Sequence, residues 1–228
     1  MKKILCIGDS LSLPGHGNKY EDTWIYKLRQ KFESQGYHFI TFFQRALTSD
    51  VLIKQGGDGS DCLEIYEPDI VILQIGIVDC APRLISPGSF NYYFIKVIPS
   101  KLKPIYLNFL KKIKKRNAKR VYVKPDKFKS NIHAYLQRCS DINIEQILII
   151  GICTPDERMI KKNPEIIKNV KLYNKILQNE AANFSFANII FPLDPQRSSE
   201  MIYEDGYHPN PVGNNLVYNE LIAYLKRE

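Results

Sequence analysis

The sequence predicts an α/β fold with three layers, in which helices cover both faces of a parallel sheet. Two observations support this prediction. Continuous apolar runs such as Ile70–Leu73 and Ile147–Ile150 are typical of strands buried on both faces. Stretches with helical apolar spacing separate these runs, and strands that alternate with helices form parallel sheets. The 228 residues suit one domain, so we expect a single domain over 1–228.

The expected elements follow one another without a linker or an internal repeat. The expected strands are 4–7, 37–43, 70–76, 147–152 and 189–191, and the expected helices are 22–35, 104–116, 164–182 and 210–226. Trp24, Leu28 and Phe32 give the first helix its apolar face, and Gly36 ends it. This order predicts a flavodoxin-like α/β/α sheet with a basic insertion at about 81–140.

Composition excludes several classes of protein. Hydrophobic residues make up 44% and charged residues 25%, which are ordinary globular values. The apolar stretch near the N-terminus, Ile4–Ile7, is too short for a signal peptide, so we expect a cytoplasmic protein. The five cysteines form no C-x-x-C pair, and His16, His38 and His133 have no ligand-like spacing. We therefore expect no disulfide framework, no metal and no cofactor.

Positive charge is concentrated in one segment. The net charge is +8, but residues 96–129 contain thirteen Lys or Arg and one acid, Asp126, which gives this segment +12 and leaves −4 for the remainder. The segment is either a solvated helix face or a site for an anion. The candidate anions are a nucleotide-linked or lipid-linked sugar, acyl-coenzyme A and the cytoplasmic membrane surface. No nucleic-acid-binding module is recognisable, so nucleic acid is not an expected partner.

Three short motifs lie where strands end or where the last helix begins. They are Gly8-Asp9-Ser10, Gln74-Ile75-Gly76-Ile77-Val78-Asp79 and Asp205-Gly206-Tyr207-His208-Pro209. In an open α/β sheet the loops at the carboxyl ends of the strands converge on one crevice. A serine becomes a nucleophile when an imidazole takes its proton, and a carboxylate orients that imidazole. We therefore predict a catalytic triad of Ser10, His208 and Asp205.

The motifs resemble those of the SGNH (GDSL-type) hydrolases. Ser10 matches the family's nucleophile block, and Asp205 and His208 match its D-x-x-H block near the C-terminus. The resemblance implies an oxyanion hole formed by the backbone amides of Ser10 and of Gly56 or Gly57. It covers the chain except for about residues 81–140.

One block departs from the family pattern. The family has G-x-N-D, whose Asn side chain donates a hydrogen bond to the oxyanion, whereas this sequence has Val78 in the Asn position. Either Arg83 or another group replaces the donor, or hydrolysis is slow, or catalysis has been lost. Asp79 is interpreted as a structural residue that pins its loop, and Asp9, Asp79 and Arg83 are candidate supporting residues.

The residues and the resemblance together predict a serine-dependent esterase that acts on an acylated carbohydrate or another small-molecule ester. Two alternatives remain open. One is an O-acyltransferase that passes the acyl group to a hydroxyl of a surface-glycan precursor. The other is a catalytically silent protein that binds an anion or a glycan.

Overall fold

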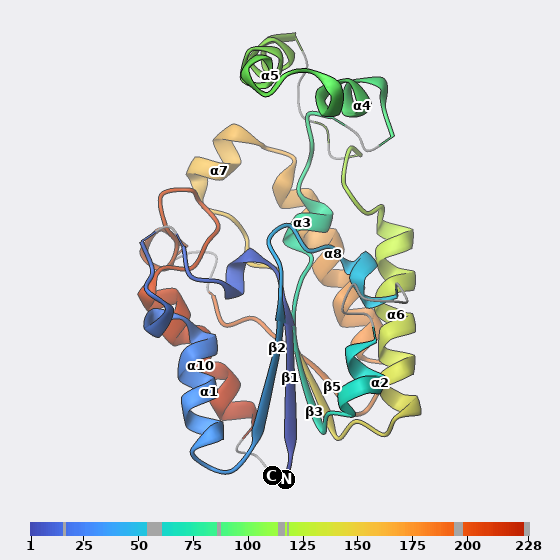
Figure 1. Cartoon of the computed structure of the whole chain (residues 1–228), viewed down its shortest axis with the longest axis vertical. Coiled ribbons are helices and arrows are strands. Elements are labelled where there is room, and N and C mark those ends of the chain that lie inside the picture. The colour runs from blue at the N-terminus through green and yellow to red at the C-terminus, as the bar shows by residue number, and fades with distance from the viewer. Residues whose placement is uncertain are drawn as a thin grey trace.

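The computed structural model describes residues 1–15, 17–53, 61–85, 88–113, 117, 119–193 and 198–225. Its centre is a sheet of five strands in the order β2-β1-β3-β4-β5, and every neighbouring pair is parallel (Figure 1). The strands are β1 (Lys3–Gly8), β2 (His38–Phe43), β3 (Ile70–Gln74), β4 (Gln146–Ile150) and β5 (Ala187–Ile190). This order confirms the predicted flavodoxin-like sheet.

Helices cover both faces of this sheet. The α-helices are α1 (Trp24–Glu33), α2 (Cys62–Tyr66), α3 (Ile77–Cys80), α4 (Phe90–Val97), α5 (Lys103–Ile113), α6 (Pro125–Asp141), α7 (Glu157–Lys162), α8 (Ile166–Ala181), α9 (Ser198–Met201) and α10 (Pro211–Leu225). Short 3₁₀ turns are η1 (Ser10–Ser12), η2 (Tyr20–Asp22), η3 (Ser49–Leu52) and η4 (Ser100–Leu102). In Figure 1, α1 and α10 lie on one side of the sheet and α2, α6 and α8 on the other. None of the helices within the described ranges is both long and apolar enough to cross a lipid bilayer.

Alternating strand residues supply the two hydrophobic cores between these layers. In β3, Val71 and Leu73 join the core beneath α6 and α8, whereas Ile70 and Ile72 join the core beneath α1 and α10. All four side chains are buried. Because both faces of the strand are buried, its sequence is a continuous apolar run. The expected strand 70–76 ends earlier, because Gly76 adopts a φ of +116° and turns the chain into α3.

The expected bounds of the insertion were wrong at the C-terminal end. Helix α6 lies inside the expected 81–140 insertion, yet its side chains Phe128, Ile132 and Leu136 are buried in the core on one face of the sheet. These residues recur every four positions and form a stripe along the helix. The lysine-rich stretch before this helix led to the expected bounds, although the only lysines of α6 itself are Lys127 and Lys129. The helix belongs to the three-layer core.

The remaining part of the insertion projects beyond the carboxyl ends of the strands. It contains α4, η4 and α5, which we call the helical arm (Phe90–Ile113) (Figure 1). The predicted helix 104–116 corresponds to α5, and residues 114–116 lie outside the described residues. The antiparallel bridge between Arg83 and Asn117 lies where the chain enters and leaves the arm.

We predict that Ile132→Ala lowers the free energy of unfolding by about 2–5 kcal/mol, because it leaves a cavity between α6 and the sheet. The matched control is Gln137→Ala on the exposed face of the same helix, which should change stability by less than about 0.5 kcal/mol. Urea denaturation of both variants measures the difference. Equal effects would contradict the assignment of α6 to the core.

Candidate active site

The turn after β1 carries Ser10 at the carboxyl edge of the sheet. Ser10 is the first residue of η1, and the Asp9 carboxylate caps this turn by accepting a hydrogen bond from the amide of Leu11 at 2.9 Å. Gly8 permits the close packing of the turn, because a Cβ there would lie 2.4 Å from the Ser12 hydroxyl oxygen. The first N–H groups of a helical turn have no partner inside it. The Ser10 amide can therefore donate to a ligand.

Gln74 at the end of β3 holds this turn from the neighbouring strand. Its backbone oxygen accepts from the amide of Asp9 at 3.1 Å, and its side-chain Oε1 accepts from the Ser12 hydroxyl at 2.5 Å and the Trp24 indole N–H at 3.2 Å. Gln74, Ser12 and Trp24 are buried. Because buried polar groups are costly without partners, this network fixes the orientation of the Ser10 turn.

The loop before α10 carries Asp205 and His208. Gly206 has a φ of +91°, and a Cβ there would lie 2.6 Å from Asp156 Oδ1, so the loop requires glycine at this position. The amide of Asp156 donates to the backbone oxygen of Gly206 at 2.9 Å, and Arg158 Nη2 donates to the backbone oxygen of Tyr203 at 3.0 Å. The start of α7 thus supports this loop, a role that the sequence analysis missed.

The structure brings the three predicted triad residues together. His208 Nδ1 is hydrogen-bonded to Asp205 Oδ2, and His208 Nε2 lies 3.1 Å from Ser10 Oγ. Asp205 Oδ1 also accepts from the amides of Tyr207 and His208, both at 3.1 Å. This geometry lets the imidazole take a proton from the serine while the carboxylate fixes the ring.

The electrostatics of the triad suit this role. Partial burial pushes the pKa of Asp205 upward, but hydrogen bonds from the Tyr207 and His208 amides and from the His208 ring outweigh it and hold the pKa below its ordinary value. Asp205 is therefore a carboxylate at neutral pH. His208 itself is buried, with 7% of its surface exposed, so the charge on Asp205 acts on the imidazole with little screening.

An open cavity of about 530 Å³ lies over the triad. Its lining consists of Ser10, Arg45, Ala46, Ile77, Val78, Ala81, Arg83, Tyr122, Met159, Lys162, Asp205, Tyr207 and His208. Three of these residues are cationic. The only carboxylate among the described lining residues is Asp205, which is hydrogen-bonded to His208. The cavity therefore presents a positive wall beside the serine.

Comparison with known proteins identifies the family of this chain. The model of the family described as GDSL-like lipase/acylhydrolase matches residues 4–221. The chain belongs to this family. Membership identifies it as an ester-hydrolysing serine enzyme and confirms the predicted resemblance. A comparison with curated protein sequences gives no match.

Solved structures share the fold of this GDSL-like chain. An acetyl xylan esterase, AlAXEase, is 17% identical over 98% of this chain and 99% of its own, with a TM-score of 0.65. The psychrotrophic esterase EstA from Pseudoalteromonas sp. is 18% identical over 100% and 98%, with a TM-score of 0.59. A lipase/acylhydrolase from Enterococcus faecalis is 17% identical over 99% and 96%, also with a TM-score of 0.59.

The expected oxyanion-hole glycines, Gly56 and Gly57, lie outside the described residues. A different residue, Ala46, lies in the loop that follows β2 and has an unusual backbone conformation. Ala46 has a φ of +60° and lines the cavity with Ser10. A non-glycine residue in the left-handed region destabilises the folded state by roughly 1–2 kcal/mol, and strained backbone conformations are common at functional sites. No sequence signal marks Ala46, because alanine does not favour this conformation.

Val78 and Arg83 lie side by side and both line the cavity. Arg83 Nη2 donates to the backbone oxygen of Val78 at 3.0 Å, and the guanidinium carbon lies 3.9 Å from the centre of the Tyr122 ring. The Val78 side chain offers no hydrogen-bond donor. Arg83 thus lies next to the position that the family's Asn occupies, held there by an aromatic ring and a carbonyl.

Asp79 makes structural contacts within its loop. Its Oδ1 accepts from the Ser49 amide at 2.8 Å and from the Ser49 hydroxyl at 2.6 Å, which joins α3 to η3. Burial raises its pKa to about 6, although the hydrogen bonds from Ser49 act in the opposite direction.

Asp9 is fully buried. Burial together with the nearby charge of Asp79 raises the pKa of Asp9 to about 7, although the hydrogen bond from the Leu11 amide acts in the opposite direction. Both carboxyls support the site from below the surface.

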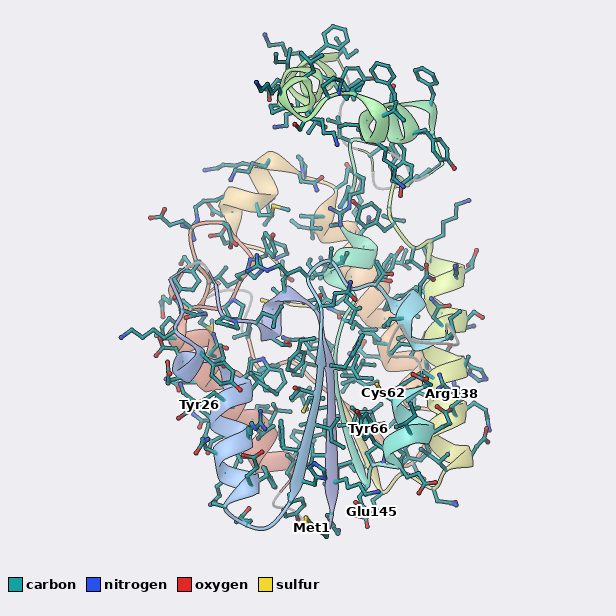
Figure 2. The ribbon with its side chains drawn as sticks, viewed as in Figure 1. Met1, Tyr26, Cys62, Tyr66, Arg138 and Glu145 are labelled. Carbon is teal, nitrogen blue, oxygen red and sulfur yellow. The ribbon has the colours of Figure 1, made fainter. Side chains whose placement is uncertain are left out.

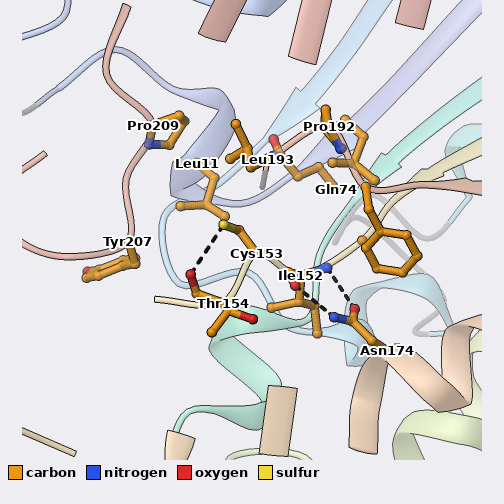
Figure 3. Close-up of a pocket in the computed structure, with 13 residues that line it drawn as sticks. Leu11, Gln74, Ile152, Cys153, Thr154, Asn174, Pro192, Leu193, Tyr207 and Pro209 are labelled. Atoms are coloured by element: carbon orange, nitrogen blue, oxygen red, sulfur yellow. Dashed lines mark hydrogen bonds between the residues drawn. The ribbon is translucent and has the colours of Figure 1, made fainter. Parts of the chain in front are cut away.

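A second cavity, of about 210 Å³, lies beside the carboxyl ends of β3 to β5 (Figure 3). Leu11 and Tyr207, the chain neighbours of Ser10 and His208, line part of it. Asn174 on α8 stabilises one wall of this cavity, because its side chain accepts a hydrogen bond from the Ile152 amide and donates one to the Ile152 backbone oxygen, both at 2.8 Å (Figure 3).

Among the residues that the structure describes, no group of three or more His, Cys, Asp or Glu side chains is placed to hold a metal ion.

We predict that Asp9→Asn weakens the pH dependence of stability. The folded-state pKa of Asp9, about 7, lies above its unfolded value, so this carboxyl contributes stability at low pH that is lost as the pH rises from about 4 through 7. The asparagine keeps the Oδ1 acceptor for Leu11 and removes the charge. Urea unfolding at several pH values from about 4 to 8 should therefore give a smaller fall for the variant. Asp141→Asn, at the exposed end of α6, is the control; an unchanged fall in Asp9→Asn would contradict a raised pKa.

Proposed function

We propose that this protein hydrolyses an acyl ester of a carbohydrate through Ser10, His208 and Asp205. The observation that carries the proposal is the chain of contacts from Asp205 through the His208 ring to Ser10 Oγ at 3.1 Å, at the floor of an open cavity. Carboxylate, imidazole and hydroxyl in this order are the groups that acyl transfer requires.

In the first step Ser10 Oγ attacks the acyl carbonyl and His208 Nε2 accepts the hydroxyl proton. The tetrahedral intermediate collapses when the C–O bond to the alcohol breaks, and His208 returns the proton to the departing alkoxide. A water molecule then attacks the acyl-serine, again losing its proton to His208, and the carboxylic acid and Ser10 are released. Asp205 remains ionised throughout and stabilises the imidazolium.

The oxyanion must be stabilised largely by backbone groups. The Ser10 amide is one candidate donor, and we propose the Ala46 amide as a second, supported by its strained backbone at the cavity wall. Val78 supplies no third donor, and the Arg83 guanidinium beside it is the proposed source of positive charge at this position. Loss of one oxyanion donor typically lowers kcat about 10²–10³-fold, which supports slow hydrolysis of a simple ester.

The substrate is proposed to carry negative charge. Arg45, Arg83 and Lys162 come from three separate parts of the chain and line the same cavity as Ser10. A carbohydrate ester that bears a phosphate or a carboxylate would match this wall. The AlAXEase relative is an acetyl xylan esterase, which supports a carbohydrate as the esterified alcohol and acetyl as the acyl group.

The proposed compartment is the cytoplasm. All five cysteines are free thiols, four of them buried, which supports a reducing environment.

We predict that Ser10→Ala and His208→Ala each lower kcat for an acetyl ester on the order of 10⁶-fold, because triad residues act as a unit. A fluorophosphonate should add to the wild type at Ser10, as read by peptide mass, and should not label Ser10→Ala. Ser130→Ala, an exposed serine of α6, is the control and should behave as the wild type. Product analysis with an added sugar acceptor separates hydrolysis from acyl transfer. Ester turnover by Ser10→Ala equal to that of the wild type would rule out this mechanism.

We predict that Lys162→Gln raises KM about fivefold for an O-acetylated sugar phosphate, because a partly screened charge pair contributes up to about 1 kcal/mol. KM for the same O-acetylated sugar without phosphate should not change, nor should kcat for either ester. Lys161→Gln is the matched control, since Lys161 is the preceding residue of α7 and does not line the cavity. A KM change of equal size for both esters would mean that Lys162 does not recognise charge.

A further inference from the structure

The helical arm carries large apolar side chains that face solvent. On α4, Phe90, Tyr93 and Val97 recur at the spacing that places side chains on one face of a helix. Phe90 is 77% exposed and Val97 is 78% exposed, and no residue of α4 is buried. Figure 2 shows the side chains of the arm standing clear of the three-layer core. Such a surface is unusual for a helix that has no partner.

Helix α5 has both an internal face and an exposed face. Tyr106 faces α4, because its hydroxyl donates to Asn91 Oδ1 at 2.7 Å and its ring lies 5.0 Å from that of Phe94. Leu110, one turn further along, is buried. Ile105 and Phe109, which are offset from this face, are 65% and 55% exposed. The two helices of the arm therefore contact each other, and the apolar side chains on the outer face of the arm remain exposed to solvent.

The charge of the arm has a single sign. From Cys80 to Pro125 the sequence contains no Asp or Glu. The lysines of the described arm are Lys96, Lys101, Lys103, Lys111 and Lys112. Exposed aromatic and aliphatic side chains thus lie among cations with no acidic residue to balance them.

We propose that the helical arm docks on the surface of an anionic lipid bilayer. Amphipathic helices rich in lysine with aromatic residues on the other face bind at the boundary between headgroups and acyl chains. Anionic headgroups attract the lysines, and the apolar face enters the interface. The helices contain 8 and 11 residues, too few to cross a bilayer, so they lie along its surface.

Charge argues against the arm of a second copy as the occupant of this face. Two arms in contact would bring two sets of lysines together without an acid between them, and like charges across an interface are unfavourable. Of the two alternatives that the sequence leaves open for 96–129, a solvated face or a site for an anion, the proposal takes the second, with lipid headgroups along the arm as the anion. This inference does not depend on which ester the cavity accepts.

Sedimentation of the full chain with vesicles tests the proposal. The vesicles contain either phosphatidylglycerol mixed with phosphatidylcholine or phosphatidylcholine alone. We expect binding to the anionic vesicles that weakens at high salt, and at least about tenfold weaker binding to phosphatidylcholine alone. The variant Ile105→Ser/Phe109→Ser should lose at least about tenfold in affinity for the anionic vesicles.

The matched control is Ile65→Ser/Leu172→Ser, which changes two exposed apolar residues outside the arm, with Ile65 64% exposed. It should bind like the wild type, and hydrolysis of a soluble ester by both variants checks that they fold. Three results would overturn the proposal. The first is an absence of binding to anionic vesicles. The second is an equal loss of vesicle affinity in the two double variants. The third is a dimer in solution that only the arm variant dissociates.

Discussion

The site depends on the close packing of the Ser10 turn against the end of β3. The parallel pairing of β1 with β3 ends at Gly8 and Gln74, and the Asp9 amide extends that contact by donating to the Gln74 backbone oxygen. Beneath the turn, Gln74 accepts from Ser12 and Trp24, which ties the sheet to α1. A side chain at position 8 would collide with Ser12, so the arrangement requires glycine there. Ser10, the proposed nucleophile, is therefore held in place by groups that do not line the cavity over the triad.

The second half of the triad depends on a separate set of supports. The His208 loop is 198 residues away from Ser10 along the chain, and the sheet alone does not determine where it lies. The backbone oxygen of Pro209 accepts from Asn18 and Asn214, and the start of α7 holds Gly206. Because these bonds converge from three parts of the chain, the imidazole reaches the serine with its orientation already set.

The sequence was sufficient for the sheet, the family and the grouping of Ser10, Asp205 and His208, because each has a strong local signal. Buried strands read as apolar runs, and the two motifs lie at strand and helix ends that must converge. Other features have no such signal. Ala46 adopts a conformation that alanine seldom favours, and no motif in the sequence marks Arg45 or Lys162 as residues of the site. The stripe of α6 was visible in principle, but the expected insertion was extended past the basic 96–129 segment, which contains only the first residue of the stripe, Phe128.

Residues at the base of the arm also line the cavity, which connects the proposed docking surface to the proposed chemistry. The Arg83 amide donates to the Arg120 backbone oxygen at 2.6 Å, and the Arg83 guanidinium lies over the Tyr122 ring. Arg83 and Tyr122 line the cavity that holds Ser10. The arm projects beyond the carboxyl ends of the strands (Figure 1), and Ser10 follows the carboxyl end of β1. An arm lying on a bilayer would therefore hold the cationic cavity close to the headgroups. An anionic ester presented at that surface would meet Ser10 without diffusing through bulk water, and the proposed charge of the substrate and the proposed docking surface then have one common explanation.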